Sequence, residues 1–334
     1  MIKSAVLSLF MLLPFVAAAQ PPALPEGRAA KPPSQSVEHW IKELTADDFR
    51  DRWYAGYVLG TLGAEAAPAV PTLHKVLEKK SEHEYVRGMA AWALGRIGPD
   101  AETEIPLLSE TMHSVGHLAV RRASVESLGN FGAAAKPVVK DLVNLLNDDD
   151  EVTRVNTAVA LWKIDRHPKA LPALLRMLRQ GTSPEPYLAA VALGQMEPEA
   201  GHPLAGTVAP ALIEALHSSD GDVRRAASRS LGQLGKAAFP ALKQAKALQD
   251  PDPEARRLVI EALSWMGPAA VAPLTAALKD KDAEVRRAAA RSLGNLGSEA
   301  KPALDALETV AADPQEEARV RSAAARARRQ IRGE

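Results

Sequence analysis

The chain has 334 residues with 41 basic and 41 acidic side chains, so its overall charge gives no general attraction to nucleic acid or to an anionic membrane. It has no cysteine, which excludes disulfides, thiolate metal sites and cysteine nucleophiles. Apolar residues make up 46% and aromatic residues only 4%, a balance that favours stacked helices over a globule built around large aromatic side chains.

The first 19 residues have the pattern of a signal peptide. Lys3 precedes an apolar run at 5–16, which is too short to span a bilayer as a helix, and the alanines at 17–19 fit the small-residue cleavage rule. Cleavage after these alanines would leave a mature chain without a membrane span. The alternative interpretation is that this segment stays uncleaved and serves as a membrane anchor. The proline-rich residues 20–36 are expected to form an extended tether. These segments predict an exported protein, either periplasmic or secreted.

Residues 37–334 repeat a pattern that ends in Leu-Gly. The second residue of this pair, taken as position 0, recurs every 30 to 38 residues, a period typical of solenoids. The residues at position 0 are Gly60, Gly95, Gly129, Trp162, Gly194, Gly232, Ser264 and Gly294. The longest spacing belongs to the irregular unit at 180–210, which is interpreted as a loop insertion or a local bend.

Each unit is expected to be a hairpin of two helices. Position −1 is always leucine, position +2 is always large and apolar, and position −5 is small or β-branched. At about 100° per residue these positions share one face of a helix, which is predicted to be the core face. A helix with proline near its start precedes this one, and the glycine at +3 is placed to end the second helix in a left-handed conformation.

Polar residues at the start of the second helix form a predicted structural ladder. An acidic residue at −12 is expected to cap the helix, and an arginine at −8 is expected to bond it or to link neighbouring units. The ladder residues are Asp48, Arg52, Arg87, Arg121, Asp150, Arg154, Asp220, Arg224, Asp252, Arg256, Asp282 and Arg286.

The proline-led first helix, the Asp-to-Arg spacing in "DKDAEVRRAAARSLGNLG" from Asp280 and the closing Leu-Gly resemble HEAT repeats, in the short form also found in phycobilin lyases. The resemblance covers about residues 37–332 and implies an all-α superhelix, or solenoid, of about eight to nine helical hairpins with a C-terminal capping helix. It implies little about function, because packing defines this family.

Catalytic signals are weak. HEAT-like deoxyhypusine hydroxylase needs four His-Glu pairs at the second helices, and the sole adjacent pair here, His83-Glu84, lies at a turn. His113 and His117 have a spacing that could bind zinc, but a turn and cap pair is the preferred interpretation. No cofactor is therefore expected, and the protein is predicted not to be an enzyme.

Positions −7 and −3 point away from the core and are expected to form the floor of a concave groove. This floor is aromatic at its N-terminal end and rich in arginine at its C-terminal end. The competing interpretations are aromatics that pack between units and arginines that are merely solvated. The predicted partner-binding residues are Trp53, Tyr57, Trp92, Tyr187, Arg225, Arg229, Arg257, Arg287 and Arg291.

The residues thus predict a non-catalytic scaffold that binds a protein or an extended peptide, with acidic segments favoured at the arginine-rich end. The alternative is a lyase-like or chaperone-like subunit that handles a small ligand or a substrate protein. Nucleic acid is not an expected partner, since the mature chain has almost no net charge. The sequence contains no feature that fixes an oligomeric state.

Overall fold

The computed structural model of the protein describes residues 35–98, 100–196 and 204–334. Every regular element in these ranges is a helix, which confirms the predicted all-α solenoid. The predicted signal peptide at 1–19 and nearly all of the tether at 20–36 lie outside the described residues. The chain divides after Ala173 into two compact units, here called the N-terminal and C-terminal units.

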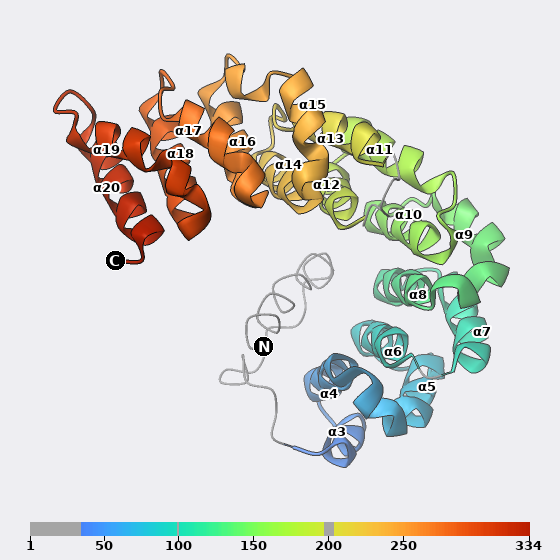
Figure 1. Ribbon diagram of the computed structural model, residues 1–334. Helices are drawn as coiled ribbons and strands as arrows, with labels where there is room; N and C mark the ends of the chain where they lie inside the picture. Colours follow the sequence, from blue (N-terminus) through green and yellow to red (C-terminus); the bar gives the residue numbers. More distant parts are fainter. Residues whose placement is uncertain (1–34, 99, 197–203) are drawn as a thin grey trace. The chain divides into compact units, whose positions relative to one another are not determined.

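The N-terminal unit is a series of helical hairpins whose second helices pack on one another in chain order (Figure 1). Ser36 caps the opening helix by accepting a hydrogen bond from the His39 N–H. Its first helices are α3 (Val37–Glu43), α5 (Val70–Glu78), α7 (Ala101–Thr111) and α9 (Val139–Leu145). Its second helices are α4 (Phe49–Leu62), α6 (Glu84–Ile97), α8 (Leu118–Asn130) and α10 (Glu151–Asp165).

The C-terminal unit repeats this arrangement, with each second helix packed on the next one. The boundary between the units falls within α11 (Ala170–Gln180), and the other first helices are α13 (Leu204–Ala215), α15 (Phe239–Gln244), α17 (Val271–Ala277) and α19 (Leu304–Ala312). The second helices are α12 (Glu185–Gln195), α14 (Gly221–Leu234), α16 (Pro253–Leu263), α18 (Ala283–Asn295) and the predicted terminal helix α20 (Ala318–Arg332).

The core is built from the positions that the repeat pattern predicts. All eight leucines at −1 are at most 2% exposed, and every residue at −5 is buried. Position +2 is buried in five units and half-buried at Leu62, Phe131 and Leu296. The apolar face of each second helix is therefore used in packing, as the periodicity indicates.

The glycine at +3 ends the second helix with a positive φ, as predicted. Gly98 has the left-handed conformation with φ 61° and ψ 28°, whereas Gly63 has φ 59° and ψ −136°, so the expected left-handed cap is not uniform. A short 3-10 helix containing the predicted proline follows several of these glycines before the next α-helix begins. These segments include η1 (Gly63–Ala69), η2 (Gly132–Val138) and η6 (Gly297–Ala303).

The glycine at position 0, which the sequence marks only as the anchor of the repeat, lies within its helix and faces the next unit. A Cβ on Gly129 would lie 2.8 Å from the Cα of Ala160, which is closer than atoms can pack. Serine or alanine stands opposite Gly95, Gly129, Gly194 and Gly294, and the two serines tie the helices together. Ser127 Oγ donates to the Ala91 carbonyl at 2.9 Å, and Ser230 Oγ donates to the Ala190 carbonyl at 2.8 Å.

We predict that Gly129→Ala lowers the free energy of unfolding by about 1–3 kcal/mol, because the added methyl group overlaps the backbone of α10. Alanine has the better helix propensity by about 1 kcal/mol, so a net loss of stability isolates the packing effect. Urea denaturation followed by circular dichroism measures it. Gly206→Ala in α13 is the matched control, since a Cβ there meets nothing within 4 Å. Equal stabilisation of both variants would contradict the close-approach role.

Candidate functional site

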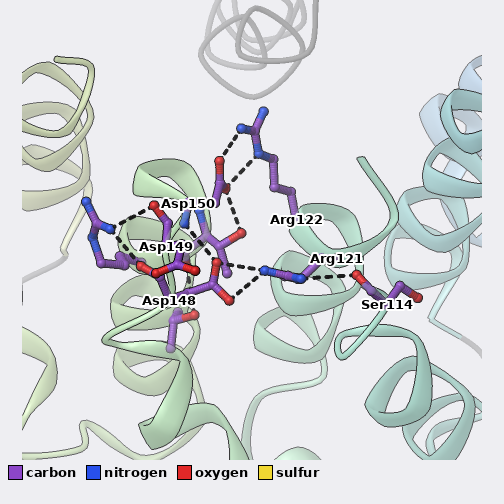
Figure 2. Close-up of polar contacts among 9 residues, drawn as sticks. Ser114, Arg121, Arg122, Asp148, Asp149 and Asp150 are labelled. Atoms are coloured by element: carbon purple, nitrogen blue, oxygen red, sulfur yellow. Dashed lines mark hydrogen bonds and ion pairs between the residues drawn. The ribbon is translucent and has the colours of Figure 1, made fainter. Parts of the chain in front are cut away.

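The arginines at −8 link their second helices to the end of the preceding helix or to the loop after it and, in several units, to the next unit. Arg121 places Nη1 2.8 Å and 2.7 Å from the two carboxylate oxygens of Asp148, and its Nη2 donates to the Ser114 carbonyl at 3.2 Å (Figure 2). Asp148 precedes α10, so this ion pair joins two consecutive hairpins. A guanidinium with several fixed donors suits this combination of carboxylate and carbonyl acceptors.

Three other arginines make the same link, which confirms the predicted connection between units. In each case the acid stands one or two residues before the cap of the next second helix, so it is not the capping residue at −12. The pairs are Arg52 with Glu82, Arg256 with Asp280 and Arg286 with Glu316. No bond between the side chains of Asp at −12 and Arg at −8 is present in the described units, because the guanidinium reaches back to the carbonyls five and six residues before it.

The remaining ladder arginines bond to backbone. Arg87 donates to the Leu77 carbonyl at 2.9 Å, and burial lowers its pKa. Arg154 and Arg224 donate to loop carbonyls at 2.6 Å and 2.7 Å respectively. Pro186 occupies this position in the irregular unit, so the unit has no such rung.

The acidic residues at −12 are helix caps, as predicted. Each accepts a hydrogen bond from a backbone N–H in the first turn of its own helix, which satisfies a donor that has no partner inside the helix. The capping residues are Asp48, Asp150, Asp220, Asp252 and Asp282.

The Arg256–Asp280 pair shows what these links contribute. Arg256 is 2% exposed, and its Nε and Nη2 each donate to Asp280 at 2.8 Å. Burial alone would raise the pKa of Asp280, but the hydrogen bonds from Arg256 and from the Asp282 N–H outweigh it and hold the pKa below its ordinary value. The two charges are therefore stable in the interior only as a pair.

The predicted aromatic floor in the N-terminal unit is wrong for its two tryptophans. Trp53 is 5% exposed and Trp92 is 6% exposed, with the half-buried Tyr57 between them. The rings stack, with centroids 5.9 Å apart for Trp53 and Tyr57 and 6.0 Å apart for Tyr57 and Trp92. Trp92 fills the space above Gly60, which has no side chain to occupy it. These aromatics pack between units, so they serve structure first.

A polar cluster follows this stack on the second helices α6, α8 and α10. Burial raises the pKa of Glu126 to about 7, against the opposing effects of Lys163, Arg96 and a hydrogen bond from Trp92. Its Oε2 atom is buried and has no hydrogen-bond partner among the described residues. Burial also lowers the pKa of Lys163, whose Nζ lies 3.0 Å from Asn130 Oδ1. Glu126 thus carries an unfavourable charge at neutral pH.

Arg122, which precedes this cluster by one turn of α8, is likewise committed to a contact within the protein. Its Nε donates to Asp150 Oδ2 at 2.8 Å, so the cap of α10 is also an ion-pair partner (Figure 2). Both side chains are largely buried.

The predicted partner-binding residues of the C-terminal unit stay at or near the surface. Tyr187 on α12 is half-buried, whereas Arg225 is exposed. Three of the arginines pair with acids of their own helix: Arg225 with Asp222, Arg257 with Glu254 and Glu261, and Arg287 with Glu284. Part of their charge is therefore neutralised locally.

Arg229 and Arg291 differ from the other arginines. Both lie at position −3 of their helices, α14 and α18, and both are exposed. Neither makes an ion pair or a side-chain hydrogen bond within the part of the chain that the structure describes. We call the surface formed by Arg225, Arg229, Arg257, Arg287 and Arg291 the arginine face; Arg257 and Arg287 are half-buried in it.

Sequence reasoning missed Trp265, which follows α16. It is 67% exposed and is the only aromatic among the exposed large hydrophobic side chains of the described residues. Its ring lies against Gly232 of α14, where a Cβ would be 2.9 Å from Trp265 Cδ1. The available signal was the replacement of the usual glycine by Ser264 directly before a tryptophan.

The histidines considered as metal ligands have other surroundings. His83 caps α6 by accepting from the Tyr85 N–H and stacks on Phe49 with ring centroids 4.1 Å apart. His117 stands at the cap position of α8, and His113 lies in the preceding turn. Within the described ranges, no three His, Asp or Glu side chains gather closely enough to hold a metal ion. No helix there is long and apolar enough to cross a membrane.

These features define an α-solenoid of helical hairpins linked by arginine–carboxylate pairs. The family model described as HEAT repeats matches residues 37–129, 105–194 and 243–329, and a second HEAT repeat model matches 208–238. The chain therefore belongs to the HEAT repeat family. Comparison with curated proteins gives no match.

Solved structures with this fold include importin beta, at 13% identity and a TM-score of 0.53, where the match covers 88% of this chain and 45% of that one. Kap95p from a complex with RanGDP gives 11% identity, a TM-score of 0.54 and coverages of 88% and 44%. The chain thus spans less than half of either protein. The CpcE–CpcF phycocyanin lyase of Nostoc sp. PCC7120 gives 20% identity, a TM-score of 0.45 and coverages of 86% and 99%. At these identities the likeness shows the fold alone.

We predict that Arg256→Ala lowers the free energy of unfolding by about 3–5 kcal/mol, because it leaves the Asp280 carboxylate without its partner. Arg225→Ala, which removes an exposed ion pair with Asp222, is the control and is expected to change stability by at most about 1 kcal/mol. Chemical denaturation of both variants at neutral pH provides the comparison. Similar small losses for both would show that the ladder does not hold units together.

We predict that Glu126→Gln stabilises the protein at pH 8 but not at pH 4.5. The folded pKa of about 7 lies above the ordinary 4.5, so ionisation opposes folding: the penalty is absent below pH 4.5 and complete above pH 7. The expected gain at pH 8 is up to about 3 kcal/mol. Melting temperatures across this pH range measure it, with Glu110→Gln as an exposed control on α7. A gain that does not vary with pH contradicts the assignment.

Proposed function

We propose that this HEAT repeat protein is a non-catalytic scaffold that binds another protein or an extended peptide through the arginine face of its C-terminal unit. One observation carries the proposal: Arg229 and Arg291 are exposed, occupy equivalent repeat positions and have no partner among the described residues. The ladder arginines, by contrast, are bonded to backbone or to carboxylates. Packing and helix linkage therefore do not account for these two side chains.

The chemistry of the arginine face favours an acidic partner. Guanidinium groups bind carboxylates through two parallel hydrogen bonds, and arginine is enriched at protein interfaces. Charge of this kind also speeds association with a partner of opposite sign. HEAT solenoids with this fold bind proteins, as the Kap95p–RanGDP complex illustrates.

The alternative function, a subunit that handles a small ligand, rests on the N-terminal unit. There the Trp53–Tyr57–Trp92 stack lies on α4 and α6, and the half-buried Glu126 follows on α8, where it accepts a hydrogen bond from Trp92. Tyr57 is partly exposed, so its aromatic ring is available for contact with a ligand. The arginine face is the stronger candidate, because Arg229 and Arg291 make no ion pair or side-chain hydrogen bond within the described residues.

Export supplies the setting of the proposal. Lys3, the apolar run at 5–16 and the alanines at 17–19 support cleavage before Gln20 and a periplasmic or secreted protein. The absence of cysteine is compatible with folding in an oxidising compartment. The partner is accordingly expected among exported proteins.

Site-specific photocrosslinking in the producing cells tests this function. We predict that a benzoyl-phenylalanine at position 291 forms a discrete covalent adduct, whereas the same group at position 176 does not. Arg176 is the matched control because it is also an exposed arginine without an ion pair among the described residues, but it lies on the first helix α11. Adding Arg229→Glu should abolish the adduct from position 291 by repelling an acidic partner.

The absence of any adduct from position 291, or identical adducts from 291 and 176, would overturn the proposal. An adduct that survives Arg229→Glu would contradict the role of the arginines. Size and composition of the adduct identify the partner directly.

A further inference from the structure

Trp265 is the side chain on the C-terminal unit that packing explains least. It exposes 67% of its surface, although tryptophan is the largest of the apolar side chains and gains most from burial. One edge rests on Gly232, which holds the indole against α14 rather than leaving it free in solvent. An aromatic side chain held in place yet exposed is typical of the residues that dominate binding energy at interfaces.

Trp265 belongs to the arginine face. Gly232 follows Arg229 by three residues on α14, and residues three apart on a helix are surface neighbours. Trp265 likewise follows Glu261 by four residues, and Glu261 is the −3 residue of α16, equivalent to Arg229 and Arg291. Since α16 packs between α14 and α18, Trp265 follows the second helix that stands between those of the two unpaired arginines, and its ring rests on the α14 side.

The spacing of the helices sets the spacing of a bound chain. Packed helix axes lie about 8–10 Å apart, and an extended chain advances about 3.3 Å per residue. A segment that crosses the second helices therefore advances about three residues per helix. Groups that reach Arg229 and Arg291 would be about six residues apart, with the residue midway between them at Trp265.

Glu261 places a negative charge between Arg229 and Arg291, which favours some acidic partners over others. It is exposed, and its carboxylate lies 2.5 Å from Arg257 Nη1. A uniformly charged polyanion, such as single-stranded nucleic acid, would meet this carboxylate between the two arginines. A chain with acids at its two contact points and an apolar side chain between them avoids that repulsion.

We propose that the face formed by Arg229, Trp265 and Arg291 binds an extended acidic peptide segment, with carboxylates about six residues apart and an apolar or aromatic side chain midway on Trp265. This inference rests on the proposed function and specifies its partner. Arg326, at the equivalent position of α20, is also exposed and unpaired in the described residues. A longer peptide could therefore place a third carboxylate on Arg326.

Fluorescence anisotropy of labelled synthetic peptides tests the inference with the purified protein. The probe is a Gly/Ser peptide with two glutamates six residues apart and a phenylalanine midway. The comparison peptides carry glutamine in place of the glutamates, or the same residues with the phenylalanine moved to one end. An oligothymidylate of equal length represents the polyanion. We predict that both altered peptides and the oligonucleotide bind at least about fivefold more weakly than the probe.

Protein variants then locate the contact. Trp265→Ser is expected to weaken probe binding about tenfold or more, and Arg229→Gln with Arg291→Gln about two- to tenfold. Arg176→Gln, which removes the same charge from a first helix, should leave binding unchanged. Because all these positions are exposed, circular dichroism and melting temperature should not change, so weaker binding reports a lost contact.

Equal binding of the probe and its rearranged form, or tighter binding of the oligonucleotide, would overturn the inference. If the peptides fail while photocrosslinking from position 291 still gives a partner, the partner chemistry is wrong and the scaffold function stands. If neither experiment detects binding, the proposed function fails as well.

Discussion

The structure depends on the close approach of consecutive second helices at the glycines of position 0. Gly129 has room only for a hydrogen atom against the backbone of α10, and Gly95 and Gly194 face Ser127 and Ser230 in the same way. A shorter distance between helices increases dispersion contacts and brings serine hydroxyls within reach of carbonyls on the neighbouring helix. It also orients each helix, so that one stripe enters the core and the opposite stripe is left for other contacts.

The arginine ladder supplies the second kind of contact between units, at the other end of the second helices. A buried guanidinium is acceptable there because loop carbonyls and one carboxylate accept hydrogen bonds from all three of its nitrogens, as Arg256 shows. The same acid also accepts the N–H of the residue that opens the next helix, as Asp280 does from Asp282. The four rungs made by Arg52, Arg121, Arg256 and Arg286 therefore each fix a loop, a helix start and a neighbouring unit together, which is a structural role for these arginines.

The repeat pattern predicted the fold well and the site only in part, for physical reasons. Periodic leucines report burial directly, so the core at −1 and −5 followed from the sequence. Exposure does not follow from helix angle alone, because it depends on what the neighbouring unit leaves open. Trp92 stands at position −3, opposite the core face of α6, yet it is buried because Gly60 on α4 leaves space for its ring. The acids that pair with the ladder arginines stand in loops, where no helical period marks them.

Trp92 and Trp265 make the same contact with opposite results. Each rests on a position 0 glycine of the preceding unit, yet Trp92 is 6% exposed and Trp265 is 67% exposed. Trp92 lies within α6, where Tyr57 stacks on one side and Arg96 covers its ring at 5.7 Å. Trp265 follows the end of α16, and no ring or guanidinium contact to it is found in the described residues. Ending one helix early thus leaves an aromatic ring both positioned and exposed, since the glycine still holds the ring while the covering side chains are lost.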